Sequence, residues 1–149
     1  MKTAALLMAC IMTASTNINA SDDKPAALND LRWKNRVFLV YVQETKTSEA
    51  LARLEEFEAE IEDRDIAWFV LDGSQMHTNY PGILEDGLQS QILSRYFTPA
   101  PSETTLLLIG KDGGLKSRSS RLGFEEAFGL IDQMPMRMEE MRNKSGGAD

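Results

Sequence analysis

The sequence predicts an α/β protein with a mixed four-stranded sheet and flanking helices. Three nearly continuous apolar runs carry this prediction, "RVFLVYVQ", "IAWFVLD" and "TTLLLIG". Each has the length of a strand, and a run that is apolar on both faces is typical of the inside of a parallel sheet. The alternating "GLKSRS" predicts a fourth strand at the edge. We expect these strands near residues 36–42, 66–71, 104–109 and 114–119.

A helix is predicted between the first two strands, over residues 47–65. Its apolar residues recur every three or four positions, as on one face of a helix: Leu51, Leu54, Phe57 and Ile61. Thr47 or Ser48 is placed to cap its first turn. A strand–helix–strand unit of this spacing makes a right-handed crossover between parallel strands.

Two further helices are predicted. Residues 88–97, "LQSQILSRYF", follow a long, turn-rich connection and end at "TPAPSE". Residues 123–134, "GFEEAFGLIDQM", turn Phe124, Phe128 and Ile131 inward. Pro135 stops this last helix or starts a new turn.

The glycines of "LLLIGKDGGLKSR" raise the question of a phosphate-binding loop. Such a loop needs glycine, four residues, glycine, lysine and then Ser or Thr, and it opens a helix. Here Thr105 stands where the first glycine should be, Asp112 follows Lys111, and a strand-like segment comes next. Asp112, Gly113 and Gly114 instead suit the positive φ angles of a tight hairpin. The segment is therefore predicted to be a turn.

Residues 1–20 have the pattern of a secretory signal. A charged "MKT" precedes the apolar "AALLMACIMTA", and the polar "STNINA" ends in a small residue before Ser21. Cys10 lies inside the apolar run, so we do not interpret it as a lipid anchor. We expect a signal over 1–20, a single domain over 21–142, a flexible tail over 143–149, and a periplasmic or extracellular location. No segment is long and apolar enough to predict a membrane span.

The net charge is −7, which is unfavourable for nucleic acid or an anionic membrane surface. Both of these partners require clustered Lys and Arg. The acidic surface is expected to keep the protein soluble.

The predicted order of strands and helices is the thioredoxin-like arrangement, a three-layer fold. Three segments, "LRWKNRVFLVY", "TTLLLIGKDGGLKSRS" and "LIDQMPMRMEEMR", resemble the family called domain of unknown function 4174, over residues 28–142. The resemblance implies a thioredoxin-like domain found in small exported bacterial proteins and some animal matrix proteins. It implies no catalytic residues.

Little in the sequence indicates catalysis. Thiol exchange needs a thiolate at the start of the first helix, but residues 43–48 contain no cysteine, and neither does the rest of the expected mature chain. Disulfide exchange and thiol peroxidase activity are therefore excluded. His77 is the one histidine, with no nucleophile motif near it. The pairs Glu55/Glu56 and Glu139/Glu140 are interpreted as solvent-facing charge, and no cofactor is predicted.

A methionine cluster near the C-terminus leaves two interpretations open. It contains Met134, Met136, Met138 and Met141. Methionine sulfur suits Cu(I), so a periplasmic copper-binding protein is the alternative function. Methionine is also a flexible filler of core gaps, and packing is the interpretation we favour, with no metal site expected.

The leading functional prediction is a non-catalytic module that binds a protein, a peptide or a surface polymer. In open sheets, ligands gather beyond the carboxyl ends of parallel strands, close to a helix N-terminus. The candidate residues on this rim are Gln43, Glu44, Thr45 and Ser48 after the first strand, with Pro99, Pro101 and Ser102 before the third. Pro99 and Pro101 lie where catalytic relatives carry a cis-proline, but the extra "SETT" argues against a cis bond here.

Overall fold

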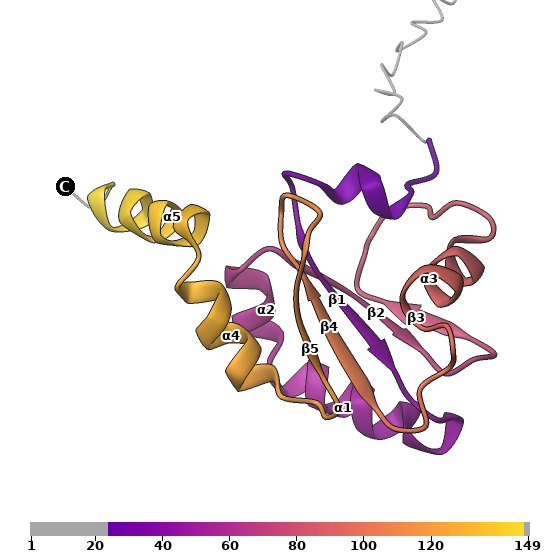
Figure 1. Cartoon of the computed structure of the whole chain (residues 1–149). Helices are drawn as coiled ribbons and strands as arrows, with labels where there is room; N and C mark the ends of the chain where they lie inside the picture. The colour runs from indigo at the N-terminus through magenta and orange to yellow at the C-terminus, as the bar shows by residue number, and fades with distance from the viewer. Residues whose placement is uncertain (1–23, 148–149) are drawn as a thin grey trace, which may run out of the picture.

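The computed structural model describes residues 24–147, and a five-stranded sheet lies at its centre (Figure 1). The predicted secretory signal and Cys10 lie outside the described residues. The elements, in chain order, are the 3-10 helix η1 (Leu28–Leu31), β1 (Arg36–Tyr41), the 3-10 helix η2 (Glu44–Lys46), α1 (Thr47–Glu56), α2 (Glu58–Asp63), β2 (Ile66–Leu71), β3 (Met76–Thr78), α3 (Leu88–Tyr96), β4 (Thr105–Ile109), β5 (Leu115–Ser119), α4 (Phe124–Asp132) and α5 (Pro135–Gly146).

The sheet is mixed, as predicted, but it has five strands and not four. Its order is β3-β2-β1-β4-β5, with β1 parallel to β2 and every other pair antiparallel. The additional strand, β3, lies in the connection that was expected to consist of turns. It is short and half-buried, so it lacks the apolar pattern by which the central strands were recognised.

Helices cover both faces of the sheet and make three layers. Alternate residues of β1 point to opposite faces: Phe38 and Val40 pack against α1, α2 and α4, whereas Val37 and Leu39 pack with η1 and α3. All four of these side chains are buried, which explains why the sequence of this strand is apolar throughout.

The predicted helix over 47–65 divides at Phe57 into α1 and α2. Phe57 has φ −103° and ψ 20°, outside the helical region. Its ring contacts Phe124 and Phe128 of α4 edge-on, at centroid distances of 6.0 and 5.5 Å. The stripe of apolar residues still faces the core across this break.

The turn after β4 is the predicted tight hairpin. The Gly110 amide donates to the Gly114 carbonyl at 2.9 Å, and Gly113 has φ +82°. The Asp112 carboxylate accepts from the Gly114 amide at 2.9 Å, which fixes the turn from within.

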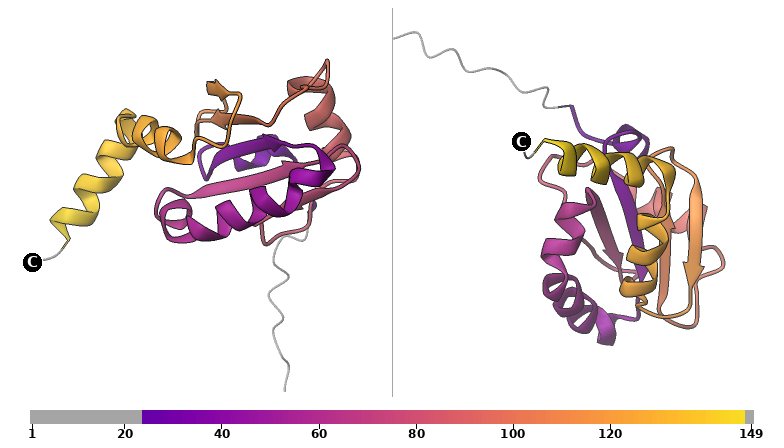
Figure 2. Two further views of the ribbon diagram at one scale, coloured as in Figure 1. Left: turned by 90° about the horizontal axis from the view of Figure 1, so that it is seen from below. Right: turned by 90° about the vertical axis from the view of Figure 1, so that its left-hand side faces the viewer.

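The C-terminal helix α5 begins at Pro135, in agreement with the expected end of the preceding helix there. It extends away from the sheet in the views of Figures 1 and 2. The helix continues to Gly146, past residue 143, where the tail was expected to begin. Within residues 24–147, no helix is both long enough and apolar enough to cross a membrane.

Candidate functional site

The predicted rim brings together two segments that are distant in the sequence. β1 and β4 are antiparallel neighbours, with Tyr41 opposite Thr105, so the segment after β1 lies beside the segment before β4. The Gln43 side-chain amide donates to the Ser102 carbonyl at 2.9 Å. This hydrogen bond joins the two loops at the carboxyl end of β1.

A groove of about 550 Å³ lies beside this junction, and we call it the rim groove. Gln43 and Ser102 are the two predicted site residues that line it. The other predicted residues do not: Glu44, Thr45, Ser48, Pro99 and Pro101 lie outside its lining. The groove is completed by Val42, Lys46, Glu49, Arg53, Glu103, Thr104, Ser120, Arg121 and Leu122.

The walls of the rim groove carry both signs of charge. Lys46 pairs with Glu49 at 3.0 Å on the first turns of the helix. Arg53 pairs with Glu56 at 2.6 Å, and Arg121 with Glu126. Arg53 and Arg121 were not predicted from the sequence, because Arg53 has the pattern of a helix surface residue and Arg121 lies in the β5–α4 loop. Such mixed, exposed pairs are adaptable contacts and contribute little to stability.

Thr47 does not cap the helix as predicted, and neither does Ser48. The residue at the N-cap position is Lys46, and no side chain caps this end of α1. The Thr47 hydroxyl donates instead to the Asp72 carboxylate at 3.1 Å, which connects α1 to the end of β2.

Asp72 is held as an anion by hydrogen bonds. Its carboxylate accepts from the Gln75 amide at 2.7 Å and from the amide and hydroxyl of Ser74 at 3.0 and 2.9 Å. The Gln75 amide is the main cause that lowers the pKa of Asp72 to about 2. A carboxylate with this pKa stays ionised near neutral pH, so Asp72 fixes the loop and is poorly suited to proton transfer.

The bond between Thr98 and Pro99 is cis, contrary to the expectation from sequence. The bond between Ala100 and Pro101 is not cis. Phe97, just before this turn, packs against the ring of Tyr41 at a centroid distance of 5.4 Å.

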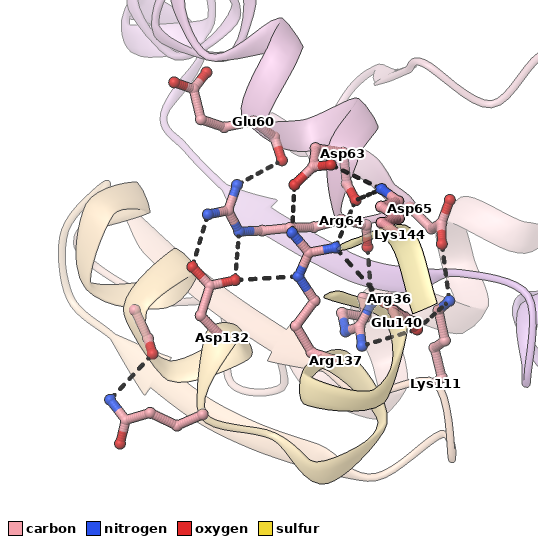
Figure 3. Close-up of polar contacts among 12 residues, drawn as sticks. Arg36, Glu60, Asp63, Arg64, Asp65, Lys111, Asp132, Arg137, Glu140 and Lys144 are labelled. Carbon is pink, nitrogen blue, oxygen red and sulfur yellow. Dashed lines mark hydrogen bonds and ion pairs between the residues drawn. The ribbon is translucent and has the colours of Figure 1, made fainter. Parts of the chain in front are cut away.

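The opposite end of the central strands, where β1 begins and β4 ends, carries a network of ion pairs around α5 (Figure 3), which we call the α5 network. It contains Arg36, Asp63, Arg64, Asp65, Lys111, Asp132, Arg137, Glu140 and Lys144. At its centre, the Arg36 guanidinium donates two hydrogen bonds, of 3.2 and 3.3 Å, to the Glu140 carboxylate. Glu140 also accepts from Lys111 at 2.8 Å.

The prediction of a solvent-facing Glu139/Glu140 pair is therefore wrong for Glu140. The Arg36 side chain is 1% exposed and that of Glu140 is 24% exposed. The sequence around Glu140 does not reveal these ion pairs, because the partners Arg36 and Lys111 are far away along the chain. By contrast, Glu139 is exposed and pairs with Arg142, and Glu55 and Glu56 are exposed as predicted.

In the α5 network each carboxylate already has a cation. Arg64 donates to Asp132 at 3.0 and 2.8 Å, and Arg137 donates to Asp132 at 3.2 Å and to Asp63. Opposite charges meet pairwise around α5, in which Arg137 is the one buried residue. These ion pairs therefore hold α5 to the rest of the domain.

The remaining candidates do not converge on a site. His77 lies on β3 opposite Val70 and is partly exposed. Met134 packs against the core as expected for a filler, but Met136 and Met138 are 42% and 44% exposed, so packing does not account for them. Among residues 24–147, no group of three or more His, Cys, Asp or Glu side chains is arranged to hold a metal ion.

The mixed sheet between two helical layers, with a rim groove beyond β1, defines a thioredoxin-like domain. Residues 24–147 contain no cysteine. The segment between β1 and α1, where a reactive thiol is expected in a catalytic domain of this fold, consists here of Gln43 and the polar residues after it. The family "Domain of unknown function (DUF4174)" matches residues 27–140, and the chain belongs to it.

The fold is also similar to that of a solved structure. The crystal structure of the reduced 2-Cys peroxiredoxin of Plasmodium vivax aligns with a TM-score of 0.51 and 14% identity, over 75% of this chain and 84% of that chain. At this identity the similarity concerns the fold alone. No curated protein matches the chain.

Proposed function

We propose that this chain is an exported, non-catalytic thioredoxin-like module that binds an extended protein or peptide segment in the rim groove. The observation that carries the proposal is the Gln43–Ser102 hydrogen bond of 2.9 Å, which makes one wall out of two loops beside a groove of about 550 Å³. A groove of this kind at the carboxyl end of the sheet is the usual place for a ligand in open α/β sheets.

The chemistry of the rim groove favours a polypeptide over an apolar small molecule. Its lining contains amide, hydroxyl and charged groups and the apolar side chains of Val42 and Leu122. Polar groups of this kind can bond to the backbone of an extended segment, and paired charges can exchange partners with its side chains.

The pattern of residues 1–20 supports export to a periplasm or an extracellular space. Mass spectrometry of the protein from its native host tests this part of the proposal. A mature chain beginning near Ser21 is expected, whereas a chain that retains Met1 after export would contradict it.

Binding in the rim groove is tested with peptides selected from a phage-displayed random library against the whole domain. The double variant Gln43→Ala/Glu103→Ala removes two polar groups of the groove. We expect the selected peptides to bind it about tenfold more weakly, which corresponds to a loss of about 1.4 kcal/mol of binding free energy. Thr45→Ala with Ser48→Ala is the matched control, since both residues lie on the same rim outside the lining. Equal weakening by the two variants would contradict a site in this groove.

Cu(I) binding, the alternative from sequence, has less support. Met136 and Met138 are two residues apart in α5, so they point about 200° apart around the helix axis. Met134 is engaged with the core. We therefore do not adopt the copper function.

A further inference from the structure

A second groove, separate from the rim groove, lies between the α1–α2 face and the first residues of β2. Its volume is about 700 Å³. We call it the acidic groove and define it by Leu51, Glu55, Glu58, Glu62, Trp68 and Tyr80. α1 and α2 both contact β2, and residues of both helices and of β2 line this groove.

One wall of the acidic groove carries carboxylates that have no cation of their own. Glu55, Glu58 and Glu62 are exposed and occur at helical spacing along one side of α1 and α2. Within residues 24–147, none of the three forms an ion pair, whereas Glu56 and Asp63 of the same two helices do. This wall is therefore a row of uncompensated negative charge.

The floor of the groove is aromatic and apolar. Trp68 and Tyr80 are half-buried, and Leu51 also lines the groove. Four arginines stack over aromatic rings elsewhere in the described chain, but none lies over Trp68 or Tyr80. Because aromatic faces and carboxylates both attract cations, wall and floor favour the same kind of ligand.

The ligand cannot enter by adding a strand to β2. Asn79 occupies this edge: its side-chain oxygen accepts from the Trp68 amide at 2.8 Å, and its side-chain nitrogen donates to the Ile66 carbonyl at 3.0 Å. With these backbone groups already satisfied, recognition must come from side chains of the partner.

A single metal ion does not fit the site either. In the described part of the chain, no three carboxylates lie close enough together to coordinate one ion. A row of separated carboxylates instead suits several cations carried on one polypeptide.

We propose that the acidic groove is a docking site for a basic polypeptide segment of a partner protein. Its lysine or arginine stems lie against Trp68 and Tyr80, and its charged ends reach Glu55, Glu58 and Glu62. The charge complementarity of this groove, and its aromatic floor without a cation, carry the proposal. The site is independent of the rim groove.

Trp68 gives a direct readout of binding. The chain has two tryptophans, Trp33 and Trp68, so Trp33→Phe leaves the groove as the source of tryptophan fluorescence. The probe is a short peptide of repeating Lys-Ala-Ala units, and the same peptide with Glu in place of Lys is the negative probe. We expect a saturable change of Trp68 fluorescence with the first peptide and none with the second.

The variant Glu55→Gln/Glu58→Gln/Glu62→Gln should weaken binding of the lysine peptide at least about tenfold. The control Glu44→Gln/Glu85→Gln/Asp86→Asn removes the same charge outside the groove and should change the affinity less than about twofold.

Equal weakening in the two variants would show attraction by the bulk negative charge and would overturn the proposal, as would absence of saturable binding. Far-UV circular dichroism confirms that each variant is folded. Unchanged binding of the lysine peptide to Gln43→Ala/Glu103→Ala separates this site from the rim groove, so either proposal can fail without the other.

Discussion

Glu140→Ala is expected to destabilise the domain by about 3 kcal/mol, because it leaves the buried Arg36 without its counterion. Lys111, which also pairs with Glu140 at 2.8 Å, would lose one of its two partners. Removing one member of a buried pair costs far more than removing an exposed pair, since the remaining charge stays desolvated. Urea unfolding followed by circular dichroism measures the loss.

The neighbouring Glu139→Ala is the control for this experiment. Glu139 pairs with Arg142 on the exposed side of α5, so its loss should change the free energy of unfolding by less than about 0.5 kcal/mol. The triple variant Arg36→Met/Lys111→Met/Glu140→Leu should recover most of the stability that Glu140→Ala loses, because no buried charge is left unpaired. Asp65 loses Lys111 in this variant, but its side chain is exposed to solvent. Equal losses in the free energy of unfolding for Glu139→Ala and Glu140→Ala would contradict the claim that the ion pairs of Glu140 hold α5 to the domain.

The same network gives the sign of the pH dependence. Burial raises the pKa of Glu140, but the hydrogen bonds from Lys111 and Arg36 outweigh it, so this pKa is lowered overall. Hydrogen bonds from Lys144 and Arg137 lower the pKa of Asp63, and that from Arg64 lowers the pKa of Asp132. Carboxyls with lowered folded-state pKa values stabilise the fold above their unfolded pKa of about 4, and this contribution is lost as the pH falls through the folded values. Glu140→Ala should flatten this acid dependence.

Phe124→Ala is expected to cost about 4 kcal/mol, the second large effect. Phe124 is fully buried at the start of α4, and its ring contacts Phe38 at a centroid distance of 5.7 Å and Phe57 at 6.0 Å. Truncation removes this burial and leaves a cavity between the sheet, α4 and the break between α1 and α2. Urea unfolding again measures the effect.

The control for the core is Leu130→Ala, in the same helix. Leu130 is 37% exposed, so its truncation should cost less than about 1 kcal/mol. A loss below about 1 kcal/mol for Phe124→Ala would contradict the aromatic packing that holds α4 to the sheet.

The central strands could be predicted from sequence because burial on both faces is recorded directly in their composition. Phe38, Leu39 and Val40 are all fully buried. The strand β3 could not be predicted, since its three half-exposed residues do not form a continuous apolar run. The break at Phe57 escaped prediction for another reason: the apolar spacing continues through it, and only contacts with α4 distinguish one helix from two.

The polar sites were predicted less completely, because their residues meet only in three dimensions. Gln43 and Ser102 were placed on one rim by the topology of the strands, whereas Arg121 joined them through a loop that gave no signal. The three segments that resemble the family contribute Arg36, Lys111, Asp132, Arg137 and Glu140 to the α5 network. Much of the recognisable sequence therefore specifies how α5 is held, and the candidate binding groove lies elsewhere.

Binding of an extended segment in the rim groove can be followed residue by residue by NMR of the isotopically labelled domain with a library-selected peptide. We expect the largest amide shift changes on the lining of the rim groove, at Val42, Gln43, Lys46, Glu49, Arg53, Ser102–Thr104 and Ser120–Leu122. Shift changes confined to other surfaces, or no saturable changes with any selected peptide, would contradict it.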